Sequence, residues 1–151
     1  MSKVADILLV AMGWSNSHLH AFGVGELRYG MHADDFPEGE IDEKTVTVLQ
    51  ALREERGFTF DYDFGDGWEH AVVIEELTWS PFGLKFAVCL DGANACPPDD
   101  VGGSGGYEEF LRAIADRTHE GHKSFLKWIG GSFDPTAFEL AEVNAALQRI
   151  R

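Results

Sequence analysis

The residue types best suited to chemistry gather at one predicted turn and on one other predicted strand. Asp63, Asp66 and His70 surround the turn, and His18 and His20 alternate along the strand. Carboxylates and imidazoles that converge from adjacent elements bind borderline divalent metals, and a bound metal can generate a nucleophile from water. Four of these residues are therefore candidate metal ligands: His18, His20, Asp66 and His70. The alternative is that Asp66 serves the turn, Asp63 is solvated and His70 is hydrogen-bonded within the fold.

A second group of candidates lies in the connector that leads to the C-terminal part of the chain. Cys89 and Cys96 flank a predicted turn, where they would form a thiol pair, half of a metal site, or two reduced structural cysteines. The glycine-rich stretch 97–106 precedes a predicted helix, a position that suits phosphate binding. It lacks the Lys followed by Ser or Thr of a phosphate loop, and Asp99 and Asp100 would repel a phosphate. We therefore expect no nucleotide site there.

Composition and charge limit the classes of protein to which the chain can belong. It has 151 residues, a net charge of −14 and 44% hydrophobic residues, which fits one globular domain over residues 1–151. The acidic balance repels phosphate backbones, so we do not expect nucleic-acid binding. No apolar run reaches the roughly 18 residues of a membrane span, and the start has no signal-peptide pattern. Together with only two cysteines, these features indicate a cytoplasmic protein.

The candidate turn belongs to the clearest structural pattern in the sequence. Residues 58–64 alternate strictly, which places the aromatic side chains of Phe58, Phe60, Tyr62 and Phe64 on one side and polar side chains on the other. The sequence Gly-Asp-Gly at 65–67 accepts the positive φ angles of a tight hairpin turn. We therefore predict a β-hairpin over 58–77 that turns at 66–67 and directs its aromatic face into the core.

Weaker patterns supply the remaining elements. A hydrophobic stripe predicts a helix over 4–13, with Gly13 as its C-cap. Strands are predicted over 19–29 and 85–90, a loop over 31–42 and a helix over 43–56. Three further helices are predicted at 107–116, at 119–129 and from Asp134-Pro135 onward. The predicted fold is α+β, with an antiparallel sheet centred on the hairpin and the C-terminal helices covering a face or an end of the sheet.

Four ordered motifs together resemble one known family. They are GWSNSHLHAF at 13–22, YDFGDGWEH at 62–70, CLDG at 89–92 with ACPPDDVGG at 95–103 and GY at 106–107, and WIGG at 128–131 with FDP at 133–135. Their identity and order are similar to the plasmid pRiA4b ORF-3-like family, also labelled a TnpR-type passenger protein of insertion elements. The resemblance extends from about Val4 to Leu147.

The resemblance implies an α+β fold and no particular reaction. The resolvase label does not fit these residues, because a serine resolvase needs a nucleophilic serine in an arginine-rich site and a DNA-binding helix pair. Members of the family usually begin with a strand-rich segment, which this sequence lacks before its first helix. We expect that the missing outer strand is replaced by strand pairing in a homodimer, or that the natural start codon lies further upstream.

The preferred hypothesis for function is a non-catalytic binding or interaction domain associated with mobile genetic elements. The alternative is a metal-dependent hydrolase with a His/Asp site, so whether the protein is an enzyme stays open. Its partner would be a protein or a small molecule, and no cofactor is predicted other than a divalent metal in the alternative. The candidate functional surface consists of His18, His20, Asp63, Asp66, Trp68, His70, Cys89, Cys96, Asp99, Asp100 and Tyr107.

Overall fold

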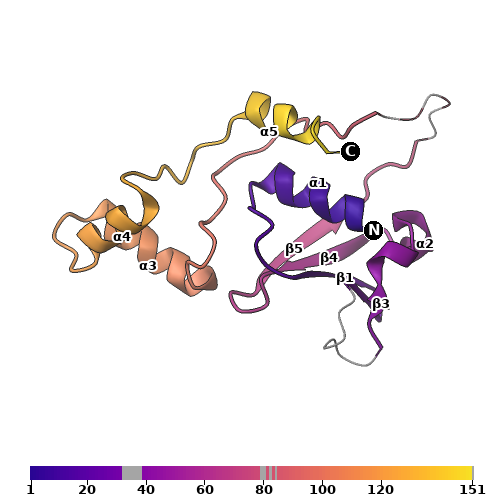
Figure 1. Cartoon of the computed structure of the whole chain (residues 1–151), viewed down its shortest axis with the longest axis horizontal. Helices are drawn as coiled ribbons and strands as arrows, with labels where there is room; N and C mark the ends of the chain where they lie inside the picture. Colours follow the sequence, from indigo (N-terminus) through magenta and orange to yellow (C-terminus); the bar gives the residue numbers. More distant parts are fainter. Residues whose placement is uncertain (32–38, 79–80, 82, 84, 151) are drawn as a thin grey trace.

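The computed structural model describes residues 1–31, 39–78, 81, 83 and 85–150 and has the predicted α+β fold (Figure 1). Its elements in chain order are α1 (Ser2–Met12), β1 (His20–Val24), β2 (Leu27–Gly30), β3 (Ile41–Asp42), the 3-10 helix η1 (Glu43–Thr45), α2 (Val48–Leu52), β4 (Gly57–Tyr62), β5 (Trp68–Val73), α3 (Gly103–Ala115), α4 (His122–Ile129) and α5 (Leu140–Leu147). None of these helices has both the length and the apolar character required to cross a bilayer.

The five strands form one sheet in the order β3-β2-β1-β4-β5. All neighbouring strands are antiparallel except the short pair β2 and β3, which is parallel. Helix α1 lies across one face of this sheet, and α5 lies against α1 (Figure 1). The predicted hairpin is confirmed as β4 and β5, and its second strand, β5, lies at an edge of the sheet. Its limits differ from the prediction, because the pairing of Tyr62 with Trp68 makes residues 63–67 the turn in place of 66–67, and β5 ends at Val73.

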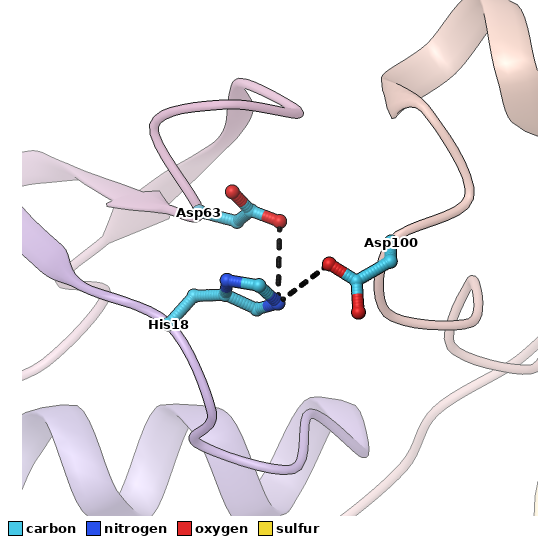
Figure 2. A group of neighbouring side chains, drawn as sticks. All are labelled: His18, Asp63 and Asp100. Atoms are coloured by element: carbon cyan, nitrogen blue, oxygen red, sulfur yellow. Dashed lines mark ion pairs between the residues drawn. The ribbon is translucent and has the colours of Figure 1, made fainter.

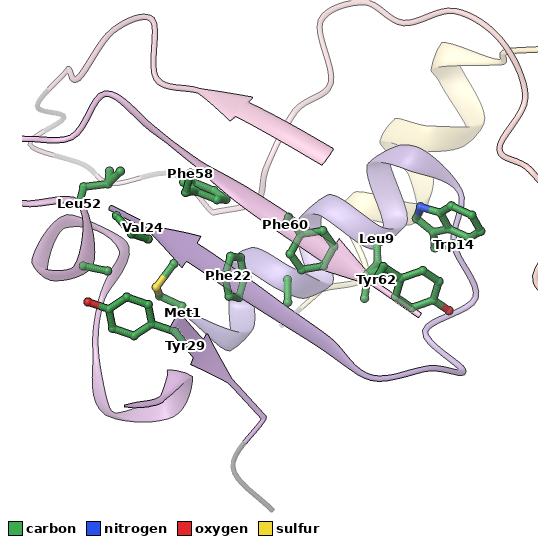
Figure 3. Close-up of a cluster of buried hydrophobic side chains, with 12 residues drawn as sticks. Met1, Leu9, Trp14, Phe22, Val24, Tyr29, Leu52, Phe58, Phe60 and Tyr62 are labelled. Carbon is green, nitrogen blue, oxygen red and sulfur yellow. The ribbon is translucent and has the colours of Figure 1, made fainter. Parts of the chain in front are cut away.

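The core lies between α1 and the sheet (Figure 3). Phe22 of β1 and Phe60 of β4 are fully buried there, with ring centroids 5.0 Å apart, and Leu9 of α1 packs into the same cluster. The period-two pattern of β4 therefore faces the core as predicted, with one exception. Phe64 is 45% exposed, because β4 ends at Tyr62 and Asp63 adopts a left-handed φ of 54° that interrupts the alternation.

Two of the strand predictions were wrong. Residues 19–29 form the hairpin β1–β2 and not one strand, because Gly25 has a positive φ of 57° and turns the chain. Residues 85–90 form no strand. The backbone N–H and C=O of Cys89 instead pair with the side-chain amide of Asn144, at 2.8 and 2.9 Å. The predicted loop 31–42 contains β3, and residues 32–38 lie outside the described part of the chain.

The predicted helix 43–56 is shorter and divided. Thr47 forms a capping box with Gln50, so the α-helix begins only at Val48, after the 3-10 turn. Arg53 has a φ of 52° and ends the helix. Gly57 then starts β4.

The C-terminal helices are present, but their limits and their packing differ from the prediction. Asp134 does not cap a helix, because its Oδ1 accepts hydrogen bonds from the backbone N–H and the hydroxyl of Thr136, and α5 begins at Leu140. Helices α3 and α4 pack on each other around the buried ring of Phe110, beyond the turn of the β4–β5 hairpin (Figure 1). One face of the sheet is therefore covered by α1, whereas α3 meets the hairpin near its N-terminal end, through Gly103 and Tyr107.

The core assignment predicts a large effect of Phe60→Ala. Phe60 is fully buried against Phe22 and His20, so truncation leaves a cavity and should lower the free energy of unfolding by about 3–5 kcal/mol. Leu90→Ala is the matched control, because Leu90 is 86% exposed and its truncation should change stability by less than about 0.5 kcal/mol. Urea denaturation followed by circular dichroism measures both, and similar small losses in the two variants would contradict the assignment.

Candidate functional site: a loop junction and an adjoining groove

Three chain segments meet where β4 ends, and we call this place the loop junction. It comprises residues 14–19 after α1, the hairpin turn 63–67, and the loop 96–103 that leads into α3. The three segments carry three of the four motifs on which the sequence resemblance rests. The junction therefore gathers residues that are far apart in the sequence.

The hydroxyl of Tyr62 connects these segments. Its ring is buried in the core, and its oxygen accepts a hydrogen bond from the backbone N–H of Ser17 at 3.1 Å. The hydroxyl donates to Oδ1 of Asp99 at 3.2 Å, and the hydroxyl of Ser15 contacts the other oxygen of that carboxylate. Asp99 is thus held in place by the end of the sheet and serves to anchor the loop.

Beside this anchor, His18 faces two carboxylates (Figure 2). Its Nε2 atom lies 3.5 Å from Oδ2 of Asp63 and 3.2 Å from Oδ1 of Asp100. The atom is buried and makes no hydrogen bond of acceptable geometry with the described residues. The three ligand atoms lie within 4.8 Å of one another, so this His/Asp group could hold a metal ion.

The backbone directs the Asp63 carboxylate toward His18. Asp63 has a φ of 54°, and its N–H donates to the carbonyl of Leu19 at 2.9 Å. Its Oδ1 accepts from the N–H groups of Gly65 and Asp66, at 3.0 and 3.3 Å. The turn therefore uses one carboxylate oxygen and leaves the other directed at the imidazole.

The same turn binds the loop that carries Asp100. Oδ2 of Asp66 accepts a hydrogen bond from the N–H of Gly102 at 2.9 Å. Gly103 has a φ of 65°, and a Cβ atom at this position would overlap the carbonyl oxygen of Asp66. Asp66 is consequently engaged with the loop backbone and does not reach His18 in this arrangement.

His20 is also placed away from the His18 group. It lies in the core, where its Nε2 is 3.0 Å from Oε2 of Glu43, and both side chains are almost completely buried. Nothing in the sequence spacing indicated this pair, because Glu43 is brought to His20 by the β3–η1 connection on the other side of β2.

His70 has both ring nitrogens in hydrogen bonds. Its Nδ1 is 2.9 Å from the carbonyl oxygen of Phe60, and its Nε2 accepts from the indole N–H of Trp14 at 3.2 Å. The ring therefore carries its proton on Nδ1. Of the four candidate metal ligands, only His18 lies in the His/Asp group, and the structure does not bring the four together.

A groove of about 530 Å³ adjoins the junction. Its walls are the end of α1, the first residues of β5 and the segment 89–97, and it is lined by the aromatic rings of Trp14, Trp68 and Phe138. Four residues of the predicted functional surface line it: Trp68, His70, Cys89 and Cys96. Trp14 and Phe138 were not included in the predicted surface. Trp14 lies in the first motif, so its place in that motif could have identified it as a candidate.

The two cysteines at the groove are free thiols. Burial, together with the nearby negative charge of Asp99, raises the pKa of the Cys96 thiol to about 12. Burial, with a smaller effect of Cys96, also raises the pKa of the Tyr107 phenol, whose ring meets Trp68 edge-on with centroids 6.4 Å apart. Cys96 is thus a protonated packing residue at neutral pH.

The chain belongs to the family described as plasmid pRiA4b ORF-3-like protein, which it matches over residues 1–142. This confirms the resemblance. It is 39% identical to the uncharacterized protein y4hQ of Sinorhizobium fredii (strain NBRC 101917 / NGR234), in an alignment that covers 99% of this chain and 78% of that protein. Its structure is similar to the crystal structure of MM3350, a protein of unknown function from Methanosarcina mazei Go1. The TM-score is 0.79 with 28% identity, and the match covers 92% of this chain and 80% of the other.

The contact of Gly103 with the hairpin turn predicts that Gly103→Ala is destabilising. Both the positive φ and the overlap with the Asp66 carbonyl oppose a Cβ atom, so we expect a loss of about 1–3 kcal/mol in unfolding free energy. Gly105→Ala in the same helix is the control, since its Cβ atom would meet nothing within 4 Å, and stability should stay equal or rise by up to about 1 kcal/mol. If thermal denaturation showed equal shifts for the two variants, the loop would not be docked on Asp66 as described.

The raised pKa of Cys96 predicts a slow reaction with iodoacetamide. Because the thiolate is the reacting form, a pKa raised from 9.0 to about 12 leaves little thiolate at pH 8, and unfolding in urea should accelerate alkylation of Cys96 more than about tenfold. Mass spectrometry of the alkylated peptides measures the rate, with a Cys89→Ser variant separating the two thiols. Equal rates in the folded and unfolded protein would contradict the burial.

Proposed function

We propose that the protein is a non-catalytic binding domain whose recognition surface is the groove. The observation that carries the proposal is the groove itself, a volume of about 530 Å³ that lies against an edge strand and is lined by three aromatic rings. Ligand sites typically enclose about 300–1,000 Å³ and have mainly apolar walls with few polar groups. Aromatic side chains in such a depression also provide most of the binding energy in many protein interfaces.

The edge strand favours an extended peptide segment as the partner. Among the described residues, strand β5 pairs only with β4, and the N–H of Ile74 donates to the carbonyl oxygen of Arg56 at the end of the hairpin. Since hydrogen-bonded and non-hydrogen-bonded pairs alternate in an antiparallel ladder, the backbone groups of Glu69, Ala71 and Val73 point away from β4. An added strand would pair with them and place side chains toward the groove.

Charge indicates which peptides should bind. The chain carries a net charge of −14, and Glu69 and Asp91 stand at the wall of the groove. A segment with alternating apolar and basic residues would complement both the aromatic lining and the carboxylates. Its affinity should fall with added salt, because these carboxylates are exposed to solvent.

The state of the polar groups in the groove supports binding without catalysis. Both nitrogens of His70 are already hydrogen-bonded, so this imidazole has no free position for accepting a proton from a substrate. The raised pKa of Cys96 keeps its thiol protonated, which makes it a poor nucleophile. The family description names a plasmid, which supports the further proposal that the domain serves a mobile genetic element.

The second candidate function is a metal-dependent hydrolase. One observation favours it, the convergence of His18 with Asp63 and Asp100 outside the groove. A hydrolase would in addition need a substrate cleft beside these three residues, but the groove described above is lined by other residues. The geometry therefore gives more support to the binding domain.

A steric block at residue 93 tests the binding function. Peptides selected on the immobilised protein from a random phage-displayed library should be rich in alternating apolar and basic residues. Ala93 lines the groove and is exposed, so Ala93→Trp should fill the site and weaken these peptides about tenfold or more, as measured by fluorescence anisotropy.

Ala137→Trp is the matched control, because Ala137 is equally an exposed alanine but does not line the groove. It should bind the selected peptides with unchanged affinity. Failure to select any peptide, or equal affinity of the two variants, would contradict the proposal. Peptide affinity that falls as the protein concentration rises would instead show that a second copy of the chain occupies the edge, and this would also contradict the proposal.

A further inference from the structure

We propose that His18, Asp63 and Asp100 bind one divalent cation of the zinc or manganese class at the loop junction. This inference does not depend on the binding function of the groove, whose lining contains none of the three residues. It rests on the separation of the three ligand atoms, on a buried nitrogen without a hydrogen-bond partner, and on the local charge.

The two separations that involve His18 fit a metal centre, and the two carboxylate oxygens lie within 4.8 Å of each other (Figure 2). Nε2 of His18 lies 3.2 Å from the Asp100 oxygen and 3.5 Å from the Asp63 oxygen. Ligand bonds of about 2.0–2.2 Å at tetrahedral angles place neighbouring donor atoms about 3.3–3.6 Å apart. A cation at the centre of the group could thus bind all three with small side-chain movements.

The Nε2 atom of His18 is buried, lacks a hydrogen-bond partner among the described residues and lies close to two carboxylates. A buried polar atom without a partner is rare in native structures and usually marks an ion, a water or a functional role. A metal ion would use the lone pair of Nε2 and neutralise Asp63 and Asp100 together.

The donor set selects the class of cation. One imidazole nitrogen with two carboxylate oxygens suits zinc, manganese or iron, whereas calcium and magnesium prefer sites made only of oxygen. Asp63 is positioned for this role, because N–H groups of the hairpin turn hold its other oxygen. Asp100 is 74% exposed, so the remaining coordination positions would face solvent and hold water.

Such a cation would connect the three segments of the junction. His18 follows α1, Asp63 begins the hairpin turn and Asp100 belongs to the loop whose first residues, 96–97, form a wall of the groove. Cation binding would therefore stabilise this wall from outside the groove. We expect it to raise the melting temperature, since the ligands are brought together only in the folded chain.

Isothermal titration calorimetry tests the proposal on full-length, untagged protein that has been treated with a chelator. Zinc and manganese chlorides are the probes, and we expect one equivalent of one of them to bind. His18→Gln and Asp100→Asn should each weaken binding about tenfold or more, because each removes a ligand. His119→Gln should have no effect, since His119 has the same side-chain exposure as His18 and also pairs with a carboxylate, that of Glu109, away from the junction.

Circular dichroism and NMR distinguish the loss of a metal ligand from a loss of folding. Asp100 is exposed, so Asp100→Asn should fold normally by circular dichroism, and Asp6→Asn on α1 controls for the loss of one negative charge. Long-range ¹H–¹⁵N NMR should show a metal-induced shift at Nε2 of His18. No stoichiometric binding, undiminished binding by Asp100→Asn, or shifts confined to other histidines would overturn the proposal, whatever the peptide experiment gives.

Discussion

Helix α1 packs against the aromatic face of β1 and β4, and this contact determines the position of everything else. Phe22 and Phe60 are fully buried under Leu9, and each such ring contributes about 1.5–3 kcal/mol of hydrophobic free energy. Because α1 is fixed on the sheet, the segment that follows it must cross the end of β4. The hairpin turn projects from the same end, so the two meet there and form the first two sides of the junction.

Tyr62 carries the order of the core into the loops. Its ring belongs to the buried cluster, whereas its hydroxyl binds the backbone of Ser17 and the carboxylate of Asp99. The loop 96–103 has no regular structure before α3 and depends on such anchors, together with the hydrogen bond between Gly102 and Asp66. The positions of the loops at the junction are thus fixed by a residue of strand β4 and not by the loop 96–103 itself.

Local patterns were enough to predict the parts of the fold that local interactions determine. The alternation from Phe58 to Tyr62 and the stripe of α1 were both visible in the sequence. His18 and Asp63 were among the candidate residues, and the structure brings them together. The exceptions depend on contacts far along the chain. Asn144 withdraws Cys89 from strand pairing, and the fold alone determines that His18 faces Asp100 while His20 faces Glu43. The hydrophobic periodicity of a sequence gives no information on contacts between residues that are so far apart in the chain.

The order of the segments along the chain has a consequence for synthesis on the ribosome. All five strands and α1 are encoded before residue 74, so the sheet and its core can form while the C-terminal part is still being made. The groove and the junction cannot, because they need the segment 89–103 and finally Phe138, which lies against Gly92. A nascent chain would therefore acquire its stable scaffold first, and it would complete the groove only after residue 138 has been made.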